Sequence, residues 1–424
     1  MTTPEGLALA TTAALVLAWS LVGAGLERRG FTAPMAFIAA GALLAVATDE
    51  SVSPDTVRFL AEITLVIVLF HDASTVRLAE LRADPWIAVR LLAVGFPVAI
   101  AMTAATTAWL FPVAGVAGAV LIAGAVTPTD AGLGAPTIMN PAVPTRVRRA
   151  LNVESGLNDG LATPVVLGAL AVLVTTTGGE EQTILSLAAV PVLLGLSIGV
   201  GLGLGGAWLL DWSRENDWSS MRARGIAVLA LPLLAFGTAE TLGGNAFIAA
   251  FVGGVAFGRF AHCVEIEGEV TETLEIAADL LGWVLWLLAG VLFVAALEVG
   301  FSWRWLALAV LALTVLRIVP VGLALLGTGF RWPTVLFLGW FGPRGIATIV
   351  FGLLALESLG DDALLADVSG VLSVTVLISV VAHGVTAGPL SHRYGAWVDR
   401  THGPIETEPS VEPMPSRGRG SIRD

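Results

Sequence analysis

The sequence is poor in charged residues and has almost no cysteine. Only 13% of its 424 residues are charged, 56% are hydrophobic, and the mean hydropathy is +0.84. So few charges could not cover the surface of a soluble chain of this length, which excludes a soluble globular protein. The single cysteine, Cys263, excludes a disulfide within the chain. A lipid bilayer is therefore the expected solvent.

Lysine is absent, so all 22 basic residues are arginine, against 34 acidic residues. The resulting net charge of −12 gives no indication of a nucleic-acid partner. The first residues, MTTPEG, carry no positive charge before the first apolar run, which argues against an ordinary secretory signal. Residues 7–25 are instead expected to form a first transmembrane helix.

A transmembrane helix needs roughly 20 mainly apolar residues. Thirteen windows of about that size occur, near 7–25, 31–48, 57–73, 86–111, 113–135, 149–175, 184–211, 222–242, 244–260, 275–298, 303–327, 332–356 and 367–390. After residue 400 the chain is rich in Pro, Glu, Ser, Gly and Arg. This change predicts a membrane transporter domain over 1–400 and a disordered cytoplasmic tail over 401–424.

The arginines give an independent test of this count, because cytoplasmic loops carry the positive charge of membrane proteins. Eighteen arginines fall in alternate connections or near the C-terminus, whereas the opposite connections hold only Arg58 and Arg304. The alternate connections contain Arg28, Arg29, Arg77, Arg82, Arg90, Arg146, Arg148, Arg149, Arg214, Arg222, Arg224, Arg259 and Arg331. The pattern predicts a multi-pass protein of the cell (inner) membrane, with its N-terminus outside and its C-terminus in the cytoplasm.

Two more arginines, Arg317 and Arg344, fall within apolar spans. An ionisable group at that depth is costly unless it is paired or faces water, so each marks a candidate functional site. Six acidic residues in apolar spans could pair with them: Asp72, Asp130, Glu154, Asp159 and, less deeply, Glu240 and Asp279. Purely structural ion pairing is the alternative explanation for some of this set.

The fifth and twelfth spans contain sequences that interrupt helices. AGAVTPTDAGLGAP places Pro128 beside Asp130, and LGWFGPRGIATIV places Pro343 beside Arg344. Each is the fifth helix of a six-helix repeat if a seventh helix links two repeats. We therefore expect an all-α polytopic fold of about 13 transmembrane helices, with two inverted six-helix repeats whose interrupted helices cross near the midplane. Asp130 and Arg344 would neutralise the half-helix ends, although two merely kinked helices remain the alternative.

The sixth span opens with ESGLNDG, which places polar side chains on two neighbouring stripes of a helix. Ser155 and Asp159 are one turn apart on one stripe, and Glu154 and Asn158 are one turn apart on the other. A carboxylate near a hydroxyl offers hard oxygen ligands that suit Na⁺ or Li⁺, and a proton. Asp159 is expected to bind either a cation or a proton, and Glu154 to pair with Arg317.

Four features in this order, TPTD, ESGLND, a lone arginine in the eleventh span and GPRG, resemble the sodium/proton exchanger branch of the monovalent cation/proton antiporters in its prokaryotic form. The resemblance extends over about 7–390. It implies a homodimer in membrane lipid, in which dimerisation helices and a mobile six-helix ion-carrying bundle are interleaved along the chain. It also implies that Thr129 and Asp72 join Asp159 and Ser155 in holding Na⁺, and that Glu154 pairs with Arg317.

The chain departs from the family pattern at one position, because Pro343 stands where a leucine usually precedes the arginine. The acid of the third span lies in LFHDAS, where His71 and Asp72 are adjacent and a pH-sensing role of His71 stays open. Asn158 stands where a second aspartate could stand. In this respect the chain resembles the branch that exchanges one ion for one proton without net charge movement.

The expected function is antiport of protons against a monovalent cation, with Na⁺ first and Li⁺ or K⁺ as alternatives, in the service of pH homeostasis. A cation channel or uniporter of similar build is the next hypothesis, and a membrane enzyme or receptor is the third. An enzyme would need a nucleophile with a base, or a cluster of metal ligands, whereas the five histidines are scattered along the chain. No enzymatic activity and no cofactor are therefore expected.

Overall fold

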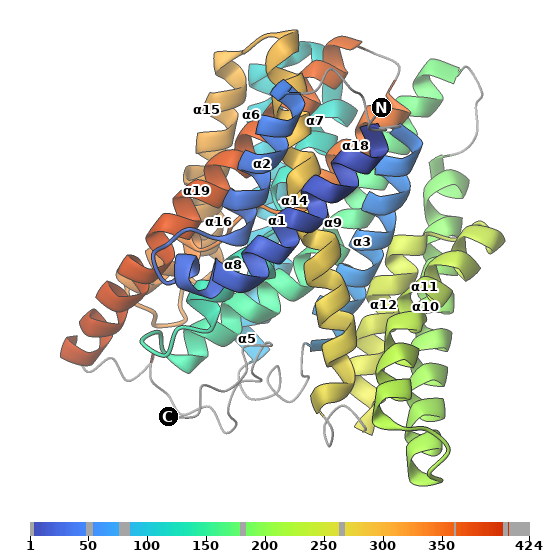
Figure 1. The fold of residues 1–424 in the computed structure, drawn as a ribbon. Helices are drawn as coiled ribbons and strands as arrows, with labels where there is room; N and C mark the ends of the chain where they lie inside the picture. The colour runs from blue at the N-terminus through green and yellow to red at the C-terminus, as the bar shows by residue number, and fades with distance from the viewer. Residues whose placement is uncertain are drawn as a thin grey trace.

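A computed structural model describes residues 4–47, 54–75, 85–178, 184–262, 268–359, 362–401 and 406 of the chain. Within these residues every regular element is a helix (Figure 1). Arg77, Arg82 and Cys263 lie outside the described residues.

The described helices form thirteen segments, one for each expected span. Nine are continuous: α1 (Pro4–Glu27), α2 (Ala33–Ala47), α3 (Pro54–Thr75), α9 (Thr145–Gly178), α10 (Ile184–Glu215), α11 (Met221–Leu242), α12 (Ala246–Phe260), α14 (Glu272–Val299), which the short η3 (Gly268–Thr271) precedes, and α19 (Asp362–Thr401). Four are divided: α5 (Pro85–Arg90), η1 (Leu91–Gly95) and α6 (Phe96–Leu110); η2 (Pro112–Ala114), α7 (Gly115–Val126) and α8 (Ala131–Ile138); α15 (Trp303–Leu313) and α16 (Val315–Ala324); α17 (Trp332–Trp340) and α18 (Ile346–Ser358).

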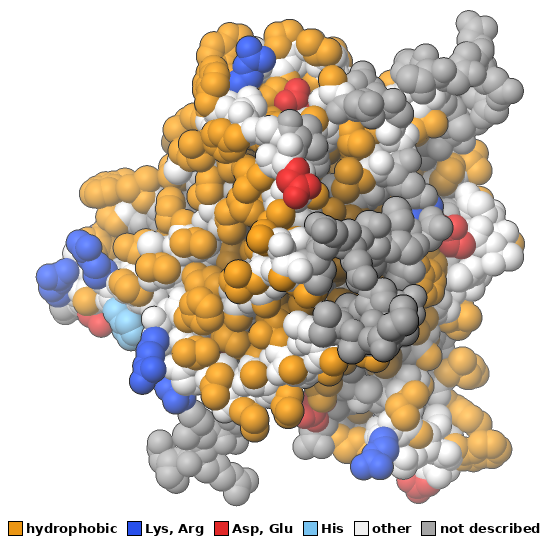
Figure 2. Space-filling model, turned by 45° about the horizontal axis from the view of Figure 1, so that its top comes forward, with side chains coloured by type: hydrophobic (Ala, Val, Ile, Leu, Met, Phe, Trp, Pro, Cys, Tyr) orange, Lys and Arg blue, Asp and Glu red, His pale blue; other side chains and the backbone are white. Residues whose placement is uncertain are grey.

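Nine helices of the described part are long and apolar enough to cross a membrane, and Ala33–Ala47, Ala246–Phe260 and Ile346–Leu356 are shorter apolar helices. On the face drawn in Figure 2, hydrophobic side chains cover much of the described surface and charged side chains are few. In Figure 1, α1 begins at the top and α19 ends at the lower left, on opposite sides of the bundle. The expected all-α, multi-pass architecture is confirmed.

The helices pack in two neighbouring groups. On the right of Figure 1, α10 and α11 pack against α12, which in turn packs against α3. On the left, α15 packs against α19. In the second group α6 and α9 both pack against α7 as well. Close approach of α2 to α14 depends on small residues, because a Cβ at Gly41 or Gly290 would overlap the backbone of the facing helix. The long α9 contacts α3, α7 and α12, so it joins the two groups.

Two interruptions were not foreseen in the sequence. In the fourth span η1 is a π-helix, in which the Phe96 N–H donates to the Leu91 carbonyl; Pro97, one residue later, has no N–H to continue the α-helical pattern. In the eleventh span the helix is broken at Thr314, whose φ of −120° and ψ of −95° are not helical. The π-helix η1 packs against α16, the half-helix that follows this break.

The last helix is longer than the sequence indicated. Instead of ending near residue 390, α19 continues to Thr401, because Tyr394 stacks on Phe337 of α17 at a centroid distance of 4.2 Å. In the tail expected at 401–424, Thr401 is helical, and the buried Glu406 carboxylate accepts a hydrogen bond of 3.1 Å from Thr334. The rest of that segment lies outside the described residues.

Candidate ion-binding site

The fifth span is interrupted where the sequence indicated. After α7 ends at Val126, residues 127–130 belong to no helix, and α8 begins at Ala131. Asp130 is the N-cap of α8 and accepts a hydrogen bond of 2.7 Å from the Leu133 N–H. Its other oxygen accepts 2.8 Å from the N–H of Ile346, the first residue of α18. One carboxylate therefore caps the N-termini of two half-helices.

The twelfth span is interrupted over residues 341–345, and this segment lies against the interruption of the fifth. The Asp130 N–H donates to the Pro343 carbonyl at 2.8 Å. Gly345 has to be glycine, because a Cβ there would overlap the Asp130 carboxylate. Pro343, the departure from the family pattern, thus supplies the carbonyl that joins the two crossing segments.

Arg344 neutralises the opposite ends of the half-helices. Its guanidinium donates to the carbonyls of Gly342 at 2.8 Å, Pro128 at 3.3 Å and Ala312 at 3.3 Å. The Gly342 carbonyl lies just after the end of α17, the Pro128 carbonyl just after the end of α7, and the Ala312 carbonyl in the last turn of α15. The C-terminal end of a helix carries a partial negative charge, which the guanidinium neutralises. The buried side chain therefore serves three broken helices, including the eleventh, whose break the sequence did not indicate.

Glu154 and Arg317 form the expected ion pair across α9 and α16. The arginine donates to both carboxylate oxygens, with Nη2 2.8 Å from Oε2 and Nη1 close to Oε1. Both side chains are buried. A bidentate pair of this kind fixes the two helices relative to each other.

Three polar residues form a hydrogen-bonded cluster between the fifth-span interruption and α9. The Thr129 hydroxyl lies 2.9 Å from the Ser155 hydroxyl and accepts 2.6 Å from the Asn158 side-chain amide. The Asn158 carbonyl oxygen accepts 3.2 Å from the Thr129 N–H. All three side chains are buried, so Asn158 holds Thr129 in place while the two hydroxyls face each other.

Asp159 follows this cluster on α9, and its carboxylate is only partly satisfied. The side chain is buried, yet its Oδ1 has no hydrogen-bond partner. The carboxylate interacts electrostatically with Asp130, Asp72 and Arg344. A buried, unpartnered carboxylate oxygen is costly and is suited to bind a cation or a proton.

Asp72 lies near the end of α3, next to His71, as the sequence implied. Its Oδ1 is 3.1 Å from His71 Nδ1, and both side chains are buried. Asp72 also interacts electrostatically with Asp159, which places it near the site.

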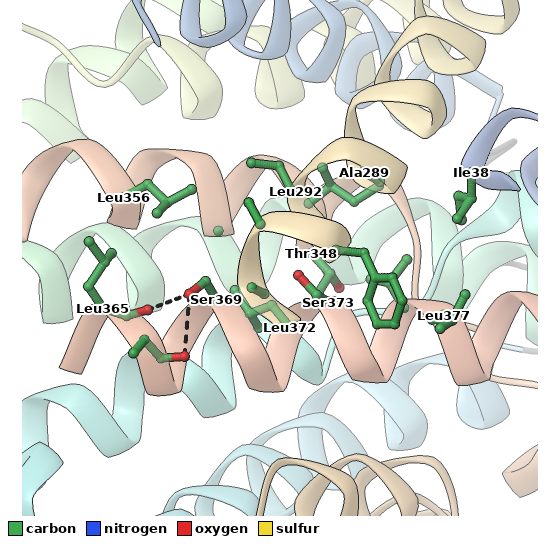
Figure 3. A pocket seen from close by; sticks show the side chains of 17 residues that line it. Ile38, Ala289, Leu292, Thr348, Leu356, Leu365, Ser369, Leu372, Ser373 and Leu377 are labelled. Atoms are coloured by element: carbon green, nitrogen blue, oxygen red, sulfur yellow. Dashed lines mark hydrogen bonds between the residues drawn. The ribbon is translucent and has the colours of Figure 1, made fainter. Parts of the chain in front are cut away.

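An apolar cavity of about 330 Å³ lies elsewhere, between α2, α14, α18 and α19 (Figure 3). Leucines dominate its wall, and the Ser369 hydroxyl donates to the Leu365 carbonyl at 2.6 Å. Thr348, also in the wall, donates to the Ala125 carbonyl at 2.9 Å. None of the described residues that line this cavity is charged.

Sequence reasoning did not single out two buried polar residues of α19, Ser379 and His383. Ser379 accepts a hydrogen bond of 2.6 Å from the Arg344 N–H, and His383 Nε2 lies 2.8 Å from the Trp340 carbonyl. The depth of His383 within an apolar span was the signal that could have found it.

Comparisons with known proteins agree on one family. The family model described as sodium/hydrogen exchanger, transmembrane, matches residues 12–393. The K(+)/H(+) antiporter NhaP2 of Shewanella oneidensis is 28% identical over 311 residues, which cover 70% of this chain and 51% of that protein. The chain thus spans about half the length of the Shewanella relatives that it matches.

Two further proteins extend the comparison. A Na(+)/H(+) antiporter of Schizosaccharomyces pombe is 25% identical over 316 residues, which cover 65% of this chain and 64% of that protein. The solved structure of the sodium proton antiporter MjNhaP1 from Methanocaldococcus jannaschii at pH 8 superposes with a TM-score of 0.73 at 16% identity, covering 92% of this chain and 98% of that one. This last likeness establishes the fold.

Proposed function

Because the chain belongs to the sodium/hydrogen exchanger family, we propose that it is an antiporter that exchanges protons for a monovalent cation, with Na⁺ first and Li⁺ possible. The observation that carries the proposal is the buried Asp159 carboxylate, whose Oδ1 has no hydrogen-bond partner, one turn along α9 from the Ser155 hydroxyl. Thr129, hydrogen-bonded to Ser155, would complete the set of oxygen ligands.

Competition at one carboxylate couples the two fluxes. Asp159 can be neutralised by a proton or by a cation, but not by both at once. The Glu154 carboxylate is engaged by Arg317, and the Asp130 carboxylate is engaged by two backbone N–H groups, so we infer that neither takes part in the exchange. One exchanging carboxylate carries one proton for one cation, which makes the exchange electroneutral.

K⁺ is the alternative cation, because the relative from Shewanella oneidensis is named a K(+)/H(+) antiporter. Oxygen ligands serve both ions, so the same site could accept either. A cation channel or uniporter would use similar ligands but would not move protons in response to a sodium gradient.

The wider setting follows from the arginine pattern and from the family resemblance. We place the protein in the cell (inner) membrane as a homodimer, with the N-terminus outside and the C-terminus in the cytoplasm. We infer a mobile six-helix ion-carrying bundle that includes the helices holding Thr129, Asp159 and Arg317, interleaved along the chain with dimerisation helices.

Fluorescence dequenching in everted vesicles tests the function. Addition of Na⁺, Li⁺ or K⁺ in turn should release the stored protons for the transported ions, and Asp159→Asn should abolish the response. Asp399→Asn, which removes an exposed carboxylate near the end of α19, is the matched control and should behave like the wild type. A strong sodium response in Asp159→Asn would remove Asp159 from the mechanism.

A further inference from the structure

The half-helix α17 ends inside the membrane region, where its last carbonyls need donors. It is only nine residues long and stops at Trp340. Bilayer hydrocarbon offers no water to satisfy those carbonyls, so the protein has to supply the hydrogen bonds. The Trp340 carbonyl accepts 2.8 Å from the Gly342 N–H, and it also faces His383 Nε2 at 2.8 Å.

His383 reaches this carbonyl from α19, a helix without interruption. The carbonyl is only an acceptor, so Nε2 has to carry the hydrogen. On the other side of the ring, Nδ1 lies 2.9 Å from the Ser379 backbone carbonyl and 3.2 Å from the Ser379 hydroxyl. The hydroxyl in turn accepts 2.6 Å from the Arg344 N–H. The Trp340 ring also packs on the imidazole at a centroid distance of 5.2 Å.

The two contacts hold both sides of the twelfth-span interruption. His383 holds the end of α17, and Ser379 holds the backbone of Arg344 just before α18 begins. Three residues after Trp340, the Pro343 carbonyl accepts the hydrogen bond from the Asp130 N–H, next to Thr129 in the chain. Gly342 lies against Thr129 as well, because a Cβ at Gly342 would come within 3.0 Å of the Thr129 methyl group. A shift at the end of α17 would therefore move Thr129.

We propose that His383 and Ser379 are positioning residues for cation binding, which hold the twelfth-span interruption so that Thr129 faces the ion. This inference rests on the proposed function. Asp159 lies on α9 and makes no described hydrogen bond to His383 or Ser379. It interacts electrostatically with Arg344, whose guanidinium is held by three backbone carbonyls independently of the Ser379 contact. Loss of the clamp should therefore weaken cation binding while proton binding at Asp159 is preserved.

Two amide substitutions of similar polarity separate this role from a general need for histidine. In His383→Gln the side-chain amide can take the place of Nε2 and donate to the Trp340 carbonyl. In His383→Asn the amide is one carbon shorter and reaches only the position of Nδ1.

Ser379→Ala removes the acceptor of the Arg344 N–H. Thr375→Val is its control, because it deletes a buried hydroxyl of α19 that bonds only to the Val371 carbonyl of its own helix.

The readout is the sodium concentration that gives half-maximal exchange in everted vesicles, together with the pH profile at saturating sodium. We expect His383→Asn and Ser379→Ala to raise the half-maximal concentration about three- to tenfold, the effect of one lost hydrogen bond, with the pH profile unchanged. His383→Gln and Thr375→Val should stay within about twofold of the wild type.

Several results would overturn the assignment. One is a half-maximal sodium concentration in His383→Asn that equals the wild-type value. Another is an equal rise of that concentration in His383→Asn and His383→Gln. A lower melting temperature in detergent with an unchanged half-maximal sodium would reduce the pair to a structural role. If the wild type itself moves no protons with Na⁺, Li⁺ or K⁺, the proposed function fails and this inference fails with it.

Discussion

Asp130 and Asp159 are both buried aspartates close to the crossing of the interrupted helices, but their carboxylates have different surroundings. Asp130 receives hydrogen bonds from the first turns of α8 and α18, one at each oxygen. Asp159 has an oxygen with no hydrogen-bond partner. An acid whose oxygens are engaged by backbone is a fixed part of the fold, whereas an acid with an unsatisfied oxygen remains available to a transported ion.

Glu154 belongs with Asp130 in this comparison, since both of its oxygens are engaged by Arg317. Three buried acids near one site thus differ in whether the protein already satisfies them. The comparison predicts large losses of stability when the engaged acids are changed, and loss of transport with little loss of stability when Asp159 is changed.

The largest effect is expected for the buried ion pair. Glu154→Ala or Arg317→Ala should each cost about 3–5 kcal/mol, because the remaining charge stays buried without its partner. The double variant should recover part of that loss. Thermal unfolding in detergent measures each variant. Arg58→Ala, which breaks an exposed pair with Glu62, is the control and should cost at most about 1 kcal/mol. Strictly additive losses would mean that Glu154 and Arg317 are not energetic partners.

A smaller effect separates the two aspartates directly. Asp130→Asn weakens the hydrogen bonds that cap α8 and α18 and should cost about 1.5–3 kcal/mol, the range for hydrogen bonds to a charged group. Asp159→Asn removes a charge whose oxygen is unsatisfied, and it should leave the melting temperature unchanged or raise it. The same unfolding assay compares them. Equal losses in the two variants would contradict the distinction between a structural and an exchanging aspartate.

Membrane potential is expected to have no effect on the rate of exchange. If Asp159 is the only exchanging carboxylate, each cycle moves one positive charge in each direction. In proteoliposomes loaded with sodium, a potassium diffusion potential set by valinomycin should leave the initial rate unchanged, provided K⁺ is not transported. A rate that changes several-fold would indicate a second exchanging acid. Asp72, which is buried beside His71, is then the first residue to substitute.

Sequence alone predicted those parts of the site that depend on local chemistry. Pro128 and Pro343 marked two interruptions because proline cannot continue the helical hydrogen bonds. Arg317 and Arg344 stood out because charge is costly at membrane depth, and the pairing of Arg317 with Glu154 followed from the same argument. The stripe of Ser155 and Asp159 followed from helical periodicity.

Other features depend on contacts between distant segments and left no local pattern. The break at Thr314 contains neither glycine nor proline, and Arg344 satisfies the Ala312 carbonyl from another span. The extension of α19 beyond residue 390 depends on the stacking of Tyr394 on Phe337. His383 was visible as a polar residue in an apolar span, but its partner, a backbone carbonyl of α17, could not be read from the sequence.

The most direct test of competition at Asp159 is proton release on cation binding. Purified protein in detergent and very weak buffer, with a pH-sensitive dye, is titrated with NaCl and, as a control, with choline chloride. A carboxylate that exchanges its proton for a metal ion releases the proton on binding. The wild type and Asp399→Asn should release about one proton per chain with sodium and none with choline, and Asp159→Asn should release none with either salt. Undiminished sodium-dependent release from Asp159→Asn would contradict the account.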